Sequence, residues 1–275
     1  MAARDFFVEV WGVFGRWIRK TFRRPAFVFF AMVQPVIWFL LFTQSFAAIG
    51  SFTQPIPGSN PPRFITFKDI TGTDSYLTFY SAAVILQTVI ASAMQSGIGM
   101  VNDIESGYMD KMRVAPIRRA SILLGKVMSD GVRILLQTSI IIVMGLLLGV
   151  TFATGVGGVL IIFLIAVTFG IAWSGISTFV ALVTRNSETT LMISLLTTFP
   201  LLFLSTAVMP KPLLPAWVQN VASYNPLTYV ADAIHALIIR GFDWTAVGYA
   251  FLIILIVGTI SLSATTAMFR KAVSA

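Results

Sequence analysis

The acidic residues between two long apolar runs are the side chains in this sequence best suited to chemistry. They are the three acids Asp103, Glu105 and Asp110, with the amide Asn102 beside them. Clustered carboxylates can hold magnesium and, through it, a pyrophosphate group. A magnesium-dependent intramembrane transferase would need a second acidic cluster facing the first, but Asp232 and Asp243 fall on the opposite side of the membrane in the predicted topology. The transferase therefore remains an alternative rather than the main interpretation.

Other catalytic patterns are missing from the sequence. The phosphate-binding pattern GxxxxGK[ST] has its nearest match at Gly125–Lys126, where Ala120 replaces the first glycine and Val127 the hydroxyl residue. The chain has no cysteine and a single histidine, His235, and HExxH and GxSxG are both absent. We therefore predict that the chain is not an enzyme and carries no cofactor or metal of its own.

The composition predicts an integral membrane protein. Of 275 residues, 57% are apolar and 11% charged, whereas soluble domains have about 45–50% and about 25%. Too few polar residues remain to coat a soluble fold. The formal net charge is +8, and the basic residues flank apolar runs. We therefore expect anionic membrane lipids, and not nucleic acid, to be their partner.

Six apolar runs are long enough to cross a bilayer as helices, which takes roughly 20 residues each. Their length and continuity exclude barrel strands. Fifteen of the nineteen Lys and Arg fall on one side of the resulting topology, which predicts that both termini are cytoplasmic. We expect the protein to lie in the plasma membrane. The fold class is all-α, with one transmembrane domain over 1–275. The predicted spans are 26–48, 76–99, 134–153, 158–182, 189–208 and 245–268.

The N-terminal segment 4–24 is predicted to be an interfacial helix. Aromatic and aliphatic residues recur on one face and basic residues lie toward the other, which is typical of a helix lying flat on a membrane. The alternative is a cytoplasmic helix packed on the protein. The apolar face comprises Phe7, Trp11, Phe14, Ile18 and Phe22, and the basic side comprises Arg16, Arg19, Lys20 and Arg23.

Two segments are predicted to lie outside the membrane on the other side. The loop 49–75 is rich in Pro, Gly and Thr, and we expect a passive connector with little regular structure. The segment 209–243 has two short apolar faces, with Asn225 as a cap and Pro226 at a helix start. We expect a re-entrant helical hairpin there, in which Asp232 and His235 pair at i, i+3 spacing or gate release.

The cytoplasmic loop 102–133 is predicted to hold a short rigid helix at about 105–114. Gly107 permits a sharp turn, Pro116 interrupts the helix, and Ser121 caps the next one. Such a helix can transmit a push between the spans it joins, while the alternative is a solvated positive loop. In the third span, Gly145 and Gly149 have GxxxG spacing, which favours close packing between helices of the chain.

Two uncharged polar stripes run along the second and fifth spans. Polar side chains in a span face the bundle or a cavity, so the stripes predict either a substrate pathway or hydrogen bonds between helices. The second-span stripe comprises Gln87, Thr88, Ser92 and Gln95, and the fifth-span stripe comprises Thr190, Ser194, Thr197 and Thr198. The absence of charge favours a neutral or amphipathic cargo.

Three motifs resemble type-2 ATP-binding cassette (ABC) permeases. The stretch ESGYMDKMRVAPIRRA with a later GK is similar to the first cytoplasmic loop of that family, NPLTYVADAIHAL to its signature before the last span, and RRPAFVFFAMVQP to its first span. Tyr108 and His235 depart from the usual Thr and Arg. The nearest group is the daunorubicin-resistance-like drug and lipid exporters. The loop residues that carry the resemblance or lie beside it are Glu105, Gly107, Asp110, Lys111, Met112, Arg113 and Pro116.

The resemblance implies an exporter subunit energised by other chains. Two permease copies would pair with two P-loop ATPase subunits, which would bind the ATP and magnesium. The 105–114 helix would be the coupling helix, and spans 2 and 5 would line the path of a drug-like or lipid-like cargo. Alternatives are a polysaccharide or glycolipid exporter of the same superfamily, the transferase, and a membrane anchor without transport.

Overall fold

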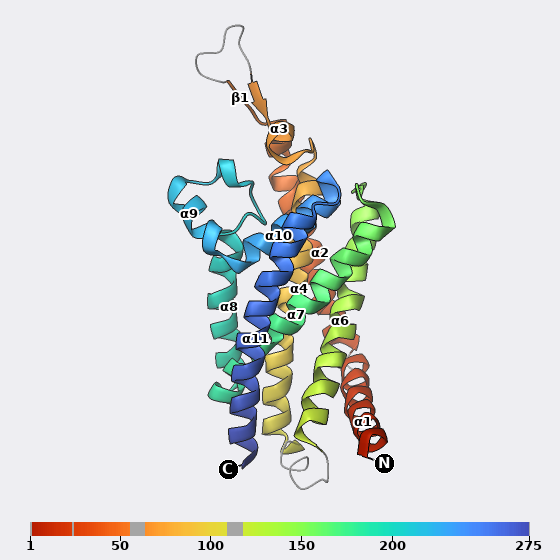
Figure 1. Ribbon diagram of the computed structural model, residues 1–275. Helices are drawn as coiled ribbons and strands as arrows, with labels where there is room; N and C mark the ends of the chain where they lie inside the picture. Colours follow the sequence, from red (N-terminus) through yellow and green to blue (C-terminus); the bar gives the residue numbers. More distant parts are fainter. Residues whose placement is uncertain (1, 24, 56–63, 109–117, 275) are drawn as a thin grey trace.

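A computed structural model describes residues 2–23, 25–55, 64–108 and 118–274 (Figure 1). Most of the predicted coupling helix, including Asp110, Lys111, Met112 and Arg113, lies outside these residues, as does Pro116 after it. The two chain termini lie at one end of a helical bundle, here called the terminal end. A small β-hairpin lies at the other, here called the hairpin end.

Long helices make up the bundle. They are α1 (Ala2–Phe22), α2 (Pro25–Ser45), α4 (Tyr76–Glu105), α6 (Arg119–Leu147), α7 (Gly155–Thr184), α8 (Ser187–Phe203) and α11 (Trp244–Ser274). Within the described residues, four stretches are long and apolar enough to cross a membrane: α4, Leu124–Leu147 of α6, α7, and Trp244–Phe269 of α11. The protein is therefore a mostly helical, multi-pass membrane protein.

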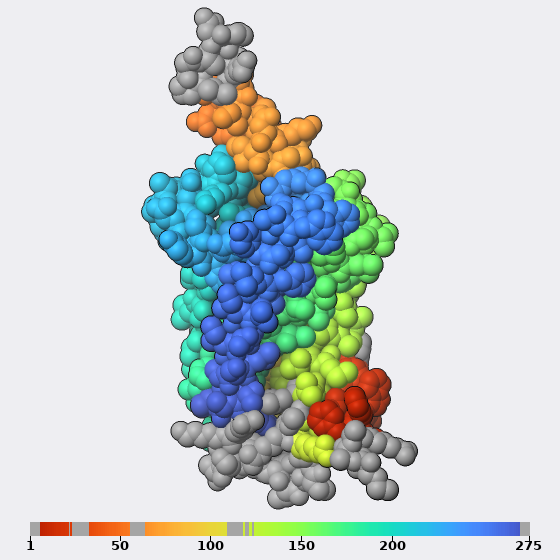
Figure 2. Space-filling model, in the orientation of Figure 1, coloured from red at the N-terminus to blue at the C-terminus, as the bar shows by residue number. Residues whose placement is uncertain are grey.

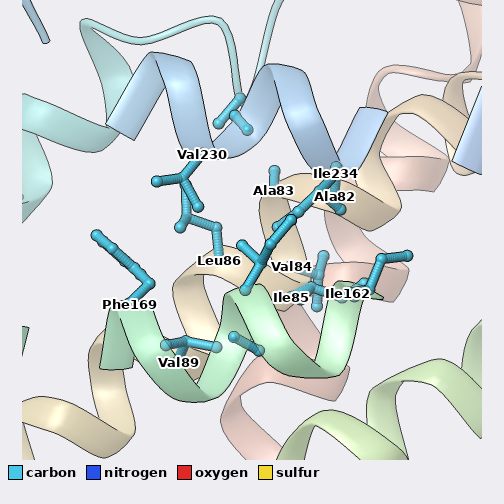
Figure 3. Packing of buried hydrophobic residues seen from close by; sticks show 14 of the residues in the cluster. Ala82, Ala83, Val84, Ile85, Leu86, Val89, Ile162, Phe169, Val230 and Ile234 are labelled. Atoms are coloured by element: carbon cyan, nitrogen blue, oxygen red, sulfur yellow. The ribbon is translucent and has the colours of Figure 1, made fainter. Parts of the chain in front are cut away.

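The bundle is organised around α4, the most deeply buried of these helices. Its middle packs against α7 on one side and against α10 (Pro226–His235) on another, and Figure 3 shows Leu86 of α4 near Val230 of α10 and Phe169 of α7. Burying such aliphatic side chains lets the helices interlock at the density of a protein interior. The central helix is thus fixed on several sides.

The third predicted span is displaced in the structure. The sequence predicts 134–153, but α6 begins at Arg119 and ends at Leu147. Gly149 has a φ of 94°, a left-handed conformation, and the Val150 amide donates to the Gly145 carbonyl at 2.8 Å. Both features are typical of a helix C-terminus ended by glycine. The expectation that Gly145 and Gly149 form a helix-packing motif is therefore wrong.

The hairpin end has more regular structure than the sequence predicts for 49–75. A 3₁₀ turn, η1 (Ala47–Ser51), precedes the antiparallel strands β1 (Thr53–Pro55) and β2 (Phe64–Thr66). The short helix α3 (Phe67–Thr71) follows, with a capping box between Thr66 and Asp69. Figure 2 shows this unit projecting beyond the helices.

The two short helices expected in 209–243 are present. After a 3₁₀ turn, η2 (Lys211–Leu213), they are α9 (Ala216–Tyr224) and α10, and Asn225 caps α10 by accepting from the Leu227 amide at 3.0 Å. A π-helical turn, η3 (Ala236–Arg240), completes the segment. The apolar face of α10 packs on the protein core, whereas Trp217 of α9 is exposed.

Close helix contacts rely on other glycines than the predicted pair. A Cβ added to Gly97 of α4 would overlap Ser177 of α7, including its backbone, whereas a Cβ on Gly248 of α11 meets nothing within 4 Å. The Ser177 hydroxyl also donates to the Met94 carbonyl at 3.0 Å, so the two backbones are held together here.

We predict that Gly97→Ala lowers stability by about 1–3 kcal/mol, because overpacking forces α4 and α7 apart. Gly248→Ala is the matched control and should be neutral or slightly stabilising, since alanine favours an open helical position by up to about 1 kcal/mol. Thermal unfolding of the purified variants in one detergent measures both. Equal midpoints would show that the α4–α7 approach is not tight.

Candidate functional site

A cavity of about 290 Å³ lies between α2, α4 and α8. Its lining is mostly aliphatic, with amide side chains from Gln34 of α2 and from Gln87 and Gln95 of α4, and the hydroxyl of Thr198 on α8. Apolar walls with a few fixed hydrogen-bonding groups are typical of small-molecule sites. The cavity suits an apolar or amphipathic ligand with groups that pair with amides.

Only some residues of the two predicted polar stripes line this cavity. Gln87, Gln95 and Thr198 line the cavity. Thr88 donates to its own helix at the Val84 carbonyl, and the Ser92 hydroxyl accepts from Arg133 of α6. Two residues of the first stripe therefore make contacts within the bundle and do not line this cavity.

The remaining α8 residues also fall outside the cavity lining. Thr190 is fully buried and donates to the Asn186 carbonyl at 2.7 Å. Ser194 is buried as well, and exposed Thr197 donates to the Ile193 carbonyl at 2.8 Å. Several residues of each stripe therefore make hydrogen bonds within the helical bundle and do not line this cavity. Gln34 of the cavity was missed, because an isolated glutamine in an apolar run forms no stripe.

A buried ionic cluster joins α4 to α6 through Ser92 and Ser96, which lie in the same stretch of α4 as the cavity residues Gln87 and Gln95. Asp130 accepts from Lys126 at 3.0 Å and from Arg133 at 2.8 Å, and the three side chains are only 2–13% exposed. Ser96 donates to Asp130 and accepts from Lys126, and the Arg133 guanidinium bonds the Ser92 hydroxyl and carbonyl. Each charge in the cluster therefore has a partner, which buried charges require.

The sequence reading did not single out Asp130. The predicted third span starts at 134, so Lys126 and Arg133 count among the cytoplasmic cations, with Lys126 on the helix that Ser121 is expected to begin. The available signal was the spacing of one acid at i+4 from a lysine and i−3 from an arginine, which puts all three on one helical face. Acidic residues inside an apolar helix mark a bundle-facing position by default.

A second ionic contact attaches α1 to the end of α4. Asp103 is 2% exposed, and its carboxylate accepts from Arg16 at 3.0 and 3.2 Å and from Lys20 at 2.6 Å. The Arg16 guanidinium also lies over the Tyr108 ring, 3.1 Å from its centroid. Asp103, predicted as part of a magnesium cluster, is therefore used to hold α1.

The face of α1 that packs on the protein differs from the predicted aromatic face. Val10, Val13 and Trp17 are buried, whereas Phe7 and Trp11 are 70% and 65% exposed. Gly125 of α6 lets α1 approach, because a Cβ there would collide with Val10 and Val13. Figure 2 shows α1 against the terminal part of α6. An interfacial position for α1 stays a prediction.

Glu9 makes a further link between α1 and α6. Its carboxylate accepts from the Ser121 hydroxyl at 2.7 Å and from the Arg118 amide at 3.1 Å, and these bonds lower the pKa of Glu9. The link is therefore present above the ordinary pKa of a glutamate and is lost as pH falls through the lowered value. Ser121 lies inside the first turn of α6, after the cap Arg118, so the predicted Ser121 cap is wrong.

The described part of the cytoplasmic loop begins with the end of α4. Glu105 is the exposed last residue of that helix, so the predicted coupling helix does not start there. Gly107 has a φ of 65°, and this left-handed conformation makes the sharp turn that was predicted. The remaining coupling residues belong to 109–117, outside the described residues.

Asp232 and His235 do not pair with each other. Asp232 accepts from the Thr206 hydroxyl at 2.7 Å, while the His235 ring bonds the Phe79 carbonyl at 3.1 Å and stacks on the Phe79 ring. The predicted pair is therefore wrong, because each side chain is taken by a different element. Both line a small cavity at the hairpin end, together with Lys211 and Arg240.

Comparison with known proteins places the chain in a family. Residues 8–239 match the model of the ABC-2 type transporter family. The chain belongs to this family, which is the permease class that the loop motifs and the helical bundle indicate. The buried ionic cluster and the amide-lined cavity are thus parts of an ABC transporter permease.

Individual relatives point to the drug-resistance group. The chain is 27% identical over 202 residues to the daunorubicin resistance ABC transporter permease protein DrrB1 of Streptomyces coeruleorubidus, covering 74% of this chain and 65% of that protein. It is 26% identical over 168 residues to a chain of Mycobacterium tuberculosis (strain ATCC 25618 / H37Rv) described as a doxorubicin resistance ABC transporter permease protein, covering 61% and 60%. It is also 23% identical over 194 residues to the inner membrane transport permease YhhJ of Escherichia coli (strain K12), covering 70% and 51%.

We predict that Asp130→Asn destabilises the protein by about 3–5 kcal/mol, because Lys126 and Arg133 lose their buried counter-charge. The control is Asp74→Asn, which removes an acid whose side chain is 71% exposed beside an exposed Lys68 and should cost at most about 1 kcal/mol. Thermal unfolding in detergent compares the two. Similar small losses in both variants would contradict a structural role for the cluster.

Proposed function

We propose that the chain is the transmembrane subunit of an ATP-driven exporter that moves a hydrophobic or amphipathic molecule out of the cytoplasm or the inner leaflet. The observation that carries the proposal is the amide-lined apolar cavity between α2, α4 and α8. Membership of the ABC-2 family supports the energy source, and the drug-resistance relatives support the cargo class.

The topology proposed has six membrane crossings with both termini in the cytoplasm. It adds α2, with 21 residues, and α8, with 17, to the four long apolar stretches. The N- and C-termini lie together at one end in Figure 1, in agreement with an even number of crossings. The segment from α9 to η3 is proposed as a re-entrant hairpin on the outer side.

The assembly proposed contains two permease copies and two separate ATPase subunits that bind ATP and magnesium. Large apolar side chains remain exposed beside the cavity, including Ile37 and Leu41 of α2 and Leu196 of α8. Lipid or a second permease copy would cover them. A cavity opening between two copies would let a change at their interface switch access from one side of the membrane to the other.

The energy would enter at the terminal end of α4. Glu105 and Gly107 lead directly into the proposed coupling segment 105–114, and α4 runs from there to the cavity glutamines as one continuous helix. A helix of 30 residues spans about 45 Å. Pushing its end therefore shifts Gln95 and Gln87 relative to α8 without any change within α4.

A polysaccharide or glycolipid exporter remains the alternative within the same superfamily. Sugar chains are commonly held by aromatic platforms, and the described lining of the cavity has a single aromatic residue, Phe199. The amide and aliphatic lining agrees better with a compact amphipathic cargo.

We predict that Gln87→Leu combined with Gln95→Leu weakens cargo recognition. Each lost hydrogen bond is worth about 1 kcal/mol, or roughly a fivefold change. Uptake of a fluorescent amphipathic dye into inside-out vesicles containing permease and ATPase measures the loss as a rise in KM. Thr197→Val is the control, because Thr197 belongs to the same stripes but lies outside the cavity. An equal effect of both changes would contradict the cavity as the binding site.

The coupling role has its own test at Gly107. Gly107→Pro should abolish ATP-driven dye uptake, because proline holds φ near −65° and the turn needs a positive value. Gly107→Asn is the control, since asparagine tolerates the left-handed conformation. We expect the proline variant to be inserted and folded, with ATP hydrolysis no longer stimulated by dye. Normal uptake by the proline variant, or by Glu105→Arg, would contradict coupling through this turn.

A further inference from the structure

A second large cavity, of about 510 Å³, lies at the terminal end against α1. Its described lining consists of four cations on one side of the helix, Arg16, Arg19, Lys20 and Arg23. Their spacing of three or four residues places them on a single helical face. This cavity shares no described lining residue with the cavity between α2, α4 and α8.

The described charges of this cavity are not balanced. Asp103 is the acid that both Arg16 and Lys20 contact, and one carboxylate neutralises one positive charge. Arg19 donates through Nε to the carbonyl of its own helix at Gly15, a neutral acceptor. An excess of three positive charges therefore faces the cavity within the described part of the chain, and such a concentration attracts an anion.

The geometry suits a phosphate group. Arg16 and Lys20 are held in place by Asp103, and the Arg16 guanidinium is also stacked on Tyr108. Guanidinium groups can donate two parallel hydrogen bonds to phosphate oxygens, and side chains already fixed lose little conformational freedom on binding. Arg19 and Arg23, on the same face, can close on the ligand from solvent.

The neighbouring exposed side chains indicate the source of the phosphate. Phe7 and Trp11, earlier on the same helix, are 70% and 65% exposed. Aromatic side chains that stay exposed beside a basic stretch are typical of a helix that inserts into the headgroup layer of a bilayer. A lipid phosphate would be present at high local concentration at this depth.

We propose that this cavity binds the headgroup of an anionic phospholipid of the cytoplasmic leaflet. Arg19 and Arg23 would provide most of the lipid selectivity, and the Asp103 contacts would hold the other two cations in the wall. Because α1 also contacts α4 through Asp103, a bound lipid would stabilise the terminal end against which the coupling segment acts. The proposal is independent of the identity of the cargo.

The test uses the full-length permease in neutral detergent micelles and a fluorescent short-chain phosphatidylglycerol as the probe. We expect it to bind more tightly than phosphatidylcholine of the same chain length. Arg19→Gln combined with Arg23→Gln should weaken phosphatidylglycerol binding on the order of 10- to 30-fold, from the attraction of about two basic residues. The control, Lys68→Gln with Lys211→Gln, removes the same charge at the hairpin end and should leave binding unchanged. Unfolding midpoints confirm that both variants fold.

Three results would overturn the proposal. Equal phosphatidylglycerol binding by the wild type and the α1 variant would remove the site. Displacement of the lipid by millimolar inorganic phosphate would assign the cavity to a free anion instead. Unchanged lipid binding together with loss of a co-purifying ATPase from the α1 variant would show that the basic face contacts an acidic protein surface.

Discussion

The shared carboxylate of Asp130 is the contact on which the terminal half of the bundle depends. It accepts hydrogen bonds from both Lys126 and Arg133 on α6. The contacts of Asp130 with Ser96 and of Arg133 with Ser92 then tie α6 to α4. Without Asp130, burying either cation in the apolar bundle would cost several kcal/mol of desolvation free energy. With Asp130 present, α6 can carry charged side chains in its buried part and still pack closely on α4.

The other contacts at the terminal end extend this arrangement. Asp103 holds α1 through Arg16 and Lys20, and Glu9 holds the start of α6. Glycines then let the helix backbones approach each other: Gly125 of α6 at its contact with α1, and Gly97 of α4 at its contact with α7. The terminal parts of α1, α4 and α6 therefore form one connected unit, while the cavity between α2, α4 and α8 has few polar groups to restrain it. This division suits a protein in which a rigid part moves against a looser binding region.

The sequence predicts the fold class well and the local partners poorly. The apolar runs of α4, α7 and α11 and the cap at Asn225 depend on nearby residues and follow from composition and spacing. The ionic cluster of α6 does not, because Asp130 is a single acid among apolar neighbours and the hydroxyls of Ser92 and Ser96 that complete the cluster come from another helix. The GxxxG pattern failed at Gly149 since the same glycine spacing also ends a helix. Asp232 and His235 have the spacing of a pair, yet Asp232 bonds Thr206 and His235 bonds the Phe79 carbonyl, both from distant segments.

Isolation of the protein complex is the most direct test of an ATPase-driven permease. A tagged copy of this chain would be purified from native membranes in a gentle detergent, and the co-purifying proteins would be identified and assayed for ATP hydrolysis. The account predicts a P-loop ATPase in equal amount to the permease, lost when Glu105 and Asp110 are both changed to lysine. A folded, abundant permease that carries no ATPase would contradict it and favour the anchoring or transferase alternatives.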